Sequence, residues 1–208
     1  MPPKQLLSIP NAVRISNRGY LPHWQLDGAV YFITYRLADS LPIDVIEALK
    51  SYRRNLIAQM THGERPPTFA EKATVRRAFE RQFDLALDAS YGAAVLGDPR
   101  AARIVTKNLK HFDDSRYELQ AYCVMPNHVH VLLGVTRGEK IEAIVHSWKS
   151  YTSCAINQLL GRRGVLWQRE YYDRIVRSFE EFTETRAYII NNPAKAGLRN
   201  WPFVWSRE

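Results

Sequence analysis

The chain has 208 residues, of which 46% are hydrophobic and 24% are charged. This length supports one well-buried core and is short for two ordinary domains, and the composition excludes a chain that is disordered throughout. Lys and Arg number 29 against 21 Asp and Glu, a formal net charge of +8, and this balance favours an anionic partner such as nucleic acid.

The first third of the chain contains one predicted strand and one predicted helix. Residues 1–26 are rich in Pro, Arg and Asn without periodicity, and we expect them to form an extended N-terminal arm. Residues 28–37, with the sequence GAVYFITYRL, combine aromatic and β-branched side chains with partial alternation, which predicts a strand. Pro42 opens a stretch to about Met60 with apolar residues at helical spacing, and the segment HGERPPT (62–68) ends it.

Helices and strands are interspersed over the rest of the chain. Apolar spacing predicts helices, and β-branched or aromatic runs predict strands, with the tight-turn signal Pro126-Asn127 between two of the strands. Pro193 and Gly197 are expected to end the last helix. The predicted helices cover residues 69–87, 99–112, 139–160 and 179–191, and the predicted strands cover residues 117–125, 128–135 and 173–177.

The order of these elements predicts the fold class. One strand is followed by helices, then by a two-stranded hairpin, a helix, a strand and a helix. This order indicates an α+β protein with one antiparallel sheet of ferredoxin-like (RRM-like) type and with helices on one face. No repeat, low-complexity tract or Gly/Ser linker interrupts the sequence, so we expect a single domain over residues 1–208.

Cysteine content and hydropathy narrow the expected cellular setting. Cys123 and Cys154 are the two cysteines and do not form a C-x-x-C pair, so the sequence predicts neither a disulfide framework nor a cysteine zinc site. A reducing cytoplasm is the simplest setting. The N-terminal segment lacks the apolar core of a secretory signal, and no run of 18 apolar residues exists, so we expect no membrane partner.

His128-Val129-His130 is the sharpest local motif. Side chains alternate between the two faces of a strand, so the two histidines lie on one face and Val129 lies on the other. Two imidazoles on one face can chelate a metal ion with little reorganisation. An isolated motif of this kind is more often two unrelated histidines on a half-exposed strand, so a third ligand is needed to support a metal site.

The last predicted helix supplies a candidate third ligand and a candidate nucleophile. Asn192 offers a side-chain carbonyl oxygen, a donor type that hard divalent metals prefer. Tyr188 lies four residues earlier and shares a helix face with Asn192. One face of this helix can therefore present a hydroxyl nucleophile and a metal ligand together. Without the two histidines, Tyr188 would be interpreted as a core aromatic and Asn192 as part of a helix terminator.

Three segments occur in a characteristic order and at characteristic separations: YCVMPNHVHVLL (122–133), LWQREYYDRIVR (166–177) and YIINNPAKAGL (188–198). Together they resemble the single-tyrosine HUH (IS200-like) transposases, and within them the branch associated with repetitive extragenic palindromes. The terminal WPFVWS (201–206) fits the same branch. The three-segment set is specific, whereas the histidine motif alone is not.

The resemblance implies a metal-dependent enzyme that cleaves and rejoins single-stranded hairpin DNA. Its pattern places the metal, Mg²⁺ or Mn²⁺, on His128, His130 and Asn192, and the nucleophile at Tyr188. The tyrosine would stay joined to the 5′ phosphate while a free 3′-OH leaves, so the reaction needs no ATP. Glutamine is common in the family at the position of Asn192, and asparagine shortens this ligand by one methylene.

The resemblance covers roughly residues 20–40 and 117–206, so residues 60–100 are expected to form a helical insertion relative to the shortest members of the family. It also implies a bacterial cytoplasmic protein that associates with the nucleoid through DNA. Related enzymes include dimers with shared active sites, whereas the palindrome-associated branch is more monomer-like, so a monomer and a homodimer both stay open. The small size favours a transposase over a replication initiator or a relaxase.

Basic and aromatic residues are interleaved between residues 137 and 177. Cations attract phosphates and aromatic faces stack on unpaired bases, a mixture that suits the binding of single strands. Four of these cations are candidates for contacts with the DNA backbone, although each can equally belong to a solvated basic surface: Lys149, Arg162, Arg163 and Arg174.

Other interpretations stay open from the sequence alone. Tyr151, Tyr171 and Tyr172 are alternative nucleophiles, but Tyr188 is the one with a potential ligand four residues later, just before a proline. A histidine-triad nucleotide hydrolase would need a histidine where Leu132 stands. A non-catalytic module could bind single-stranded RNA through the aromatics of its sheet, or a domesticated transposase could bind hairpin DNA with little or no cleavage, and a pure binding module would have no need for Mn²⁺.

Overall fold

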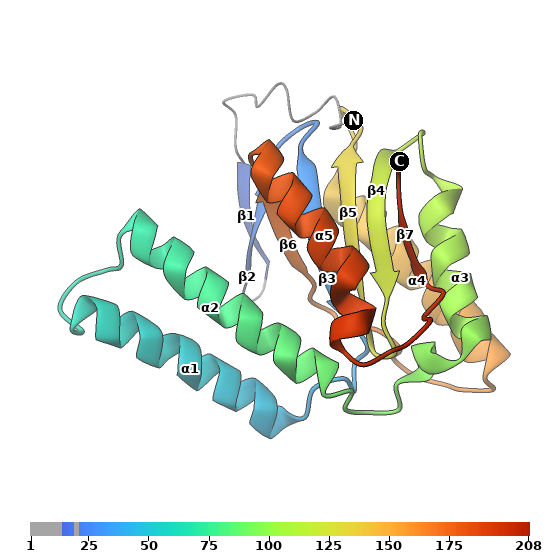
Figure 1. Cartoon of the computed structure of the whole chain (residues 1–208), viewed down its shortest axis with the longest axis horizontal. Helices are drawn as coiled ribbons and strands as arrows, with labels where there is room; N and C mark the ends of the chain where they lie inside the picture. Colours follow the sequence, from blue (N-terminus) through green and yellow to red (C-terminus); the bar gives the residue numbers. More distant parts are fainter. Residues whose placement is uncertain (1–13, 19–20) are drawn as a thin grey trace. The chain divides into compact units, whose positions relative to one another are not determined.

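The computed structural model describes residues 14–18 and 21–208, which form two compact units (Figure 1). The main unit contains the described residues up to Ala38 and again from Val95 to Glu208, and the second unit contains Asp39–Ala94. The expectation of a single domain over the whole chain stays a prediction. Within the described residues, no helix is long and apolar enough to cross a membrane.

Five strands form the antiparallel sheet of the main unit. They lie in the order β6-β3-β5-β4-β7, and every neighbouring pair is antiparallel. The hairpin predicted around Pro126-Asn127 is β4–β5, and the strand with the two histidines occupies the centre of the sheet. The strands are β3 (Val30–Arg36), β4 (Tyr117–Val124), β5 (His128–Val135), β6 (Tyr172–Val176) and β7 (Val204–Ser206).

Side chains alternate across this sheet and form two apolar clusters. On β3, Tyr31 belongs to the larger cluster, whereas Phe32 belongs to the smaller cluster on the opposite face. Helices α3 (Pro99–His111) and α4 (Ile141–Leu159) contribute residues to the larger cluster. Helix α5 (Phe179–Lys195) covers the smaller one and contacts β4 and β5, and it runs diagonally in front of the sheet in Figure 1.

The predicted α+β class and the antiparallel main sheet are confirmed. The expectation that the helices lie on one face needs a correction, because α5 covers the face opposite to α3 and α4. Phe182 and Ile189 of α5 are buried in the same cluster as Leu132 of β5. A sheet that carries apolar side chains on both faces needs cover on both.

Helix α5 also continues past its predicted end. Pro193 lies inside the helix, and the N–H groups of Ala196 and Leu198 donate to the carbonyls of Asn192 and Pro193. The φ of proline is fixed near −65°, a helical value, so the helix can continue through Pro193, although proline has no N–H to donate to the Ile189 carbonyl. Gly197, at a φ of 75°, then ends the helix as predicted.

Three short strands were not predicted as such. β1 (Arg14–Arg18) and β2 (Leu21–Gln25) pair as a separate antiparallel sheet inside the predicted N-terminal arm. The rest of that arm, residues 1–13 and 19–20, lies outside the described residues. β7 pairs with β4 at the edge of the main sheet. Its three residues are too few to show a strand period in the sequence.

The second unit is a pair of packed helices, α1 (Ile43–Thr61) and α2 (Phe69–Asp88). Apolar residues of both helices, including Leu49 and Leu87, form its core. This unit therefore contains α1 in addition to most of the residues 60–100 expected as an insertion, whereas residues 95–100 belong to the main unit. It holds eight Lys or Arg and eight Asp or Glu, so the net charge of the chain lies outside it.

The two ends of this unit meet. The backbone N–H of Ala93 donates to Oδ2 of Asp39 over 2.9 Å. Between them Gly92 adopts a φ of 81°, and a Cβ at this position would lie 2.4 Å from the Asp39 carbonyl oxygen. Only glycine fits this close approach. The first and last residues of the unit therefore lie next to each other in space.

A capping box begins α2. The N–H of Glu71 donates to Oγ1 of Thr68, and the N–H of Thr68 donates to Oε2 of Glu71 over 2.7 Å. Bonds from Arg65, and then from Thr68, lower the pKa of Glu71 from 4.5 to about 2. The stability that they contribute is present above pH 4.5 and is lost as the pH falls toward 2.

Replacing Thr68 with Ala should reduce the free energy of unfolding of the second unit by about 1 kcal/mol, because one N–H at the start of α2 loses its acceptor. Chemical denaturation followed by helical circular dichroism measures the change. Thr74→Ala is the matched control, since the Thr74 hydroxyl donates to the Ala70 carbonyl within the helix and caps nothing. Equal midpoints for the two variants would show that the box contributes no stability.

Candidate active site

His128 and His130 lie on the same face of β5, as strand alternation predicts, and both are buried. Their Nε2 atoms are 3.0 Å apart. Metal–nitrogen bonds to histidine are about 2.1 Å long, so two such nitrogens at a right angle around one ion lie about 3 Å apart. The spacing of the pair therefore fits two neighbouring ligands of a single metal ion.

The other ring nitrogen of each histidine is held by a polar side chain. His128 Nδ1 is 2.7 Å from Oδ1 of Asn127, and His130 Nδ1 is 2.8 Å from Oγ1 of Thr34. Thr34 stands directly opposite His130 in the register of β3 and β5. Hydrogen bonds of this kind fix the orientation of metal-binding imidazoles. Both rings are thus oriented before any ion binds.

Burial keeps both imidazoles neutral at physiological pH. Desolvation lowers the pKa of His130 to about 3, and desolvation together with the neighbouring His130 lowers the pKa of His128 well below its usual value. A neutral imidazole has one N–H and one lone pair, whereas the Thr34 hydroxyl both donates and accepts. Thr34 can therefore serve either tautomer of His130, including the one that leaves Nε2 free to bind a cation.

Tyr188 approaches the histidine pair from α5. Its hydroxyl is 3.3 Å from His130 Nε2, and its ring stands edge-on to Phe32 with 5.9 Å between the ring centres. Lys195 Nζ lies 5.4 Å from the centre of the same ring. The structure thus brings the predicted nucleophile to the predicted metal ligand across 58 residues of sequence.

Phe32 was not among the predicted site residues. Its ring stacks on His130 with 5.5 Å between centres and also meets Tyr188 edge-on, so it packs against both side chains. The available signal was its position on the predicted strand 28–37, because Phe32 and Thr34 share one face of that strand. The sequence near Phe32 does not show which residue of a neighbouring strand its ring would contact.

Asn192 is buried one helical turn beyond Tyr188. Within the described residues its Oδ1 atom has no hydrogen-bond partner. A buried carbonyl oxygen without a partner is costly, and it is a donor type that binds hard cations. No three His, Cys, Asp or Glu side chains in residues 14–18 and 21–208 gather as a metal site. A third protein ligand beside the histidines would therefore have to be of another type, such as this amide oxygen.

The four predicted DNA-contacting cations lie in different environments. Lys149, on α4, donates to the carbonyls of Gln168 and Arg169 over 2.6 and 2.8 Å. The Arg174 side chain is 14% exposed, pairs with Glu181 and lies over the Phe32 ring. Arg162 is half-buried and Arg163 is exposed in the turn after α4, on the side of the sheet opposite to α5.

Comparison with known families identifies the kind of protein to which these features belong. A family model described as "Transposase IS200 like" matches residues 80–192, which is more than half of the chain. The chain belongs to this family. The matched region of this IS200-like transposase contains both histidines and Tyr188, and it ends at Asn192.

Individual relatives are more distant. A curated protein of Haemophilus influenzae, with the provisional name REP-associated tyrosine transposase, is 24% identical over 101 residues, which are 42% of this chain and 57% of the relative. The chain thus matches little more than half of that relative's length.

Two solved structures are similar in part. One is a REP-associated tyrosine transposase bound to a REP hairpin, with a TM-score of 0.48, 16% identity, and coverage of 91% of this chain and 81% of the other. The second is a crystal structure described as a transposase from Deinococcus radiodurans, with a TM-score of 0.32, 20% identity, and coverage of 85% and 96%.

Proposed function

We propose that this IS200-like transposase cleaves and rejoins single-stranded hairpin DNA through a covalent 5′-phosphotyrosine bond at Tyr188. The observation that carries the proposal is the 3.3 Å distance between the Tyr188 hydroxyl and His130 Nε2. A hydroxyl this close to the two buried imidazoles would lie beside the metal ion that they hold.

His128, His130 and Asn192 would hold a divalent metal ion, Mg²⁺ or Mn²⁺. The fit rests on two Nε2 atoms 3.0 Å apart, which share a hydrogen bond in this structure and would each turn a lone pair to the ion, and on the buried Asn192 Oδ1, which lacks a partner among the described residues. An ion bound there supplies Lewis-acid polarisation of the scissile phosphate. Asn127 and Thr34 keep the rings in place by holding their Nδ1 atoms.

The chemical step uses the chain's own groups as follows. The Oη atom of Tyr188 forms a bond to phosphorus, the bond from phosphorus to O3′ breaks, and O3′ leaves with the electron pair and takes a proton. The phenolic proton passes to solvent. The Lys195 ammonium, 5.4 Å from the ring centre, stabilises the negative charge that builds on the phenol during the attack. A second 3′-OH reverses the step and reseals the strand.

Unpaired, hairpin-forming DNA is the substrate that suits this chemistry. An in-line attack by a side chain on a helix needs a backbone that is accessible at the cut. The name of the Haemophilus influenzae relative points to repetitive extragenic palindromes, which form such hairpins. The net charge of +8 lies outside residues 39–94, so the unit that contains the tyrosine also has the charge that attracts DNA.

The test combines metal binding with covalent chemistry. Purified protein is incubated with labelled hairpin oligonucleotides from repeats that flank its gene, with Mn²⁺, with Mg²⁺ or with EDTA, and adducts are counted on a denaturing gel. Titration calorimetry measures Mn²⁺ binding without DNA. We expect a metal-dependent adduct in the wild type, and a loss of both signals in His130→Ala and Asn192→Leu.

Three results would change the proposal. An adduct that forms equally well in EDTA would remove the metal from the mechanism. Mn²⁺ binding that persists in Asn192→Leu would remove this residue from the ligand set and leave the histidines. Hairpin binding without an adduct under any metal would identify a domesticated DNA-binding protein.

A further inference from the structure

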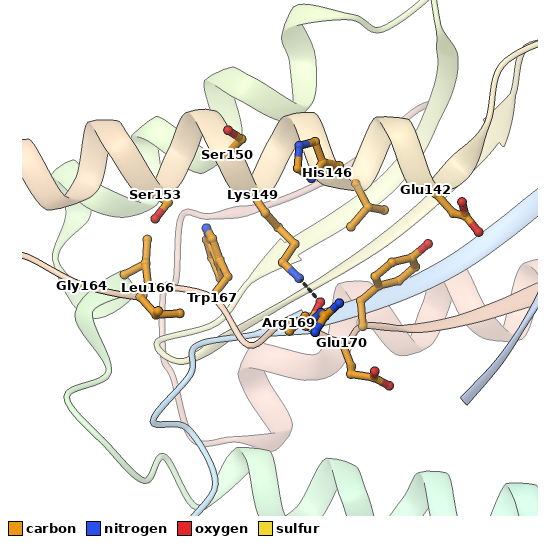
Figure 2. Close-up of a pocket in the computed structure, with 13 residues that line it drawn as sticks. Glu142, His146, Lys149, Ser150, Ser153, Gly164, Leu166, Trp167, Arg169 and Glu170 are labelled. Carbon is orange, nitrogen blue, oxygen red and sulfur yellow. Dashed lines mark hydrogen bonds between the residues drawn. The ribbon is translucent and has the colours of Figure 1, made fainter. Parts of the chain in front are cut away.

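A pocket of about 740 Å³ lies between α4 and the segment 164–171 (Figure 2). α4 covers the face of the sheet opposite to α5, so this pocket is separate from the site at Tyr188. Figure 2 shows Lys149 reaching from α4 across the pocket to the segment that carries Arg169 and Glu170. A volume of this size is within the usual range of small-molecule pockets and holds one nucleotide.

Lys149 is the half-buried cation of the pocket, whose lining also includes Arg169, Glu142 and Glu170. The Lys149 ammonium uses two donors on the carbonyls of Gln168 and Arg169, which leaves its third N–H for a ligand. Burial is the main cause that lowers the pKa of Lys149 to about 8, and the nearby Arg36 charge lowers it further, against the opposing effect of Glu170. A bound phosphate would compensate for the desolvation of this ammonium.

Other residues that line the pocket could contact a nucleobase, which a bare ion would not need. The Lys149 ammonium lies 5.9 Å from the centre of the Tyr171 ring, so an aromatic wall adjoins the cation. Val165 is 76% exposed at the same pocket, and Ser150 and Ser153 supply hydroxyls from α4. Aromatic and apolar walls with a few hydroxyls accept an unstacked base, and a neighbouring ammonium accepts its phosphate.

We infer that the pocket between α4 and the segment 164–171 binds one unstacked nucleotide of the DNA substrate, with its phosphate at Lys149 and its base against Tyr171 and Val165. The inference rests on the proposed function, because it takes single-stranded DNA as the ligand. It adds a second point of attachment, on the face of the sheet that does not carry the nucleophile. The strand would therefore be held on one face and cut on the other.

Binding is measured by fluorescence anisotropy with a labelled hairpin oligonucleotide in EDTA at about 150 mM salt, so that no cleavage is needed. Lys149→Gln should weaken the affinity roughly tenfold, the usual effect of losing one charge-assisted hydrogen bond, and reduce the salt slope by about 1. Lys107→Gln is the matched control, because Lys107 is an exposed lysine on α3, and its affinity should stay within about twofold of the wild type.

A second pair of variants separates nucleotide binding from a purely structural role of Lys149. Glu170→Gln removes a negative charge beside the pocket and should strengthen DNA binding, whereas Ser153→Trp fills the pocket, keeps Lys149 and should weaken it. 2-Aminopurine placed at each unpaired position should lose its fluorescence at one position, and Ser153→Trp should restore it. If Lys149 only braced the segment, Glu170→Gln and Ser153→Trp would both bind like the wild type, and the inference would be overturned.

Failure of this inference can be told apart from failure of the proposed function. If Lys149→Gln binds DNA like Lys107→Gln while the wild type forms the tyrosine adduct, the pocket has no role and the chemistry stands. If no adduct forms but the pocket variants shift the affinity as expected, the pocket binds DNA and the cleavage proposal is wrong.

Discussion

Replacing Tyr188 with Phe should lower the yield of covalent protein–DNA adduct by roughly a thousandfold or more, to below detection. The change removes the attacking oxygen and its contact with His130, whereas the ring keeps its edge contact with Phe32 and its contact with Lys195. The lost 3.3 Å contact to His130 joins a half-buried hydroxyl, so the melting temperature should change little. Hairpin binding on a native gel should also persist, which would show that the variant is folded.

The neighbouring tyrosines provide the controls. Tyr172 meets the same Phe32 ring, with 6.4 Å between centres, and is the nearest alternative nucleophile. Tyr151 is 60% exposed on α4, on the other face of the sheet. Tyr172→Phe and Tyr151→Phe should both form the adduct. If the adduct survived in Tyr188→Phe and vanished in Tyr172→Phe, the chemistry would stand and the nucleophile would be Tyr172.

Replacing Trp148 with Ala should lower the free energy of unfolding by about 3–5 kcal/mol. Trp148 is fully buried, and its Nε1–H donates to the Tyr117 hydroxyl over 3.0 Å, which in turn donates to the Leu109 carbonyl over 2.7 Å. This chain of bonds joins α4, β4 and α3. Truncation therefore leaves both a large cavity and a buried hydroxyl with one fewer partner.

Denaturant titration monitored by near-ultraviolet circular dichroism measures this change. Tyr151→Ala is the matched control, because it truncates an aromatic three residues later on the same helix that is 60% exposed. Its cost should stay within about 0.5 kcal/mol, as is usual for a surface position. A similar cost for both variants would show that the larger apolar cluster does not determine the stability of the main unit.

The parts of the site that could be predicted from sequence are those encoded by short spacings. The alternation of a strand places His128 and His130 on one face, and four residues on a helix place Tyr188 and Asn192 on another. That these two faces meet was implied by the family resemblance, and for Tyr188 and His130 the structure shows the contact. Whether Asn192 ligates a metal stays a prediction.

The residues of β3 that contact His130, Thr34 and Phe32, could not be predicted from short spacings. Thr34 is 96 residues from His130, and only the register of the completed sheet places its hydroxyl at Nδ1. The same limit explains the error over α5. Local apolar spacing gives the inner face of a helix, but which side of the sheet it covers depends on the connection from β6. Pro193 was interpreted from its average behaviour, whereas a position near the helix end accommodates it.

The hydrogen bond between Asp39 and Ala93 makes the helical pair a segment that protein engineering could replace. Because the helical pair starts and finishes at one place, we expect a change in the length of chain between those two residues to leave the register of β3 and β5 unchanged. Lengthening a connection of this kind costs little chain entropy. The junction is therefore a natural attachment point: the pair could be exchanged in a single genetic step for a short turn, or for a reporter domain with adjacent termini. Diversity among related enzymes is expected to concentrate at such a junction, at no cost to the histidine strand.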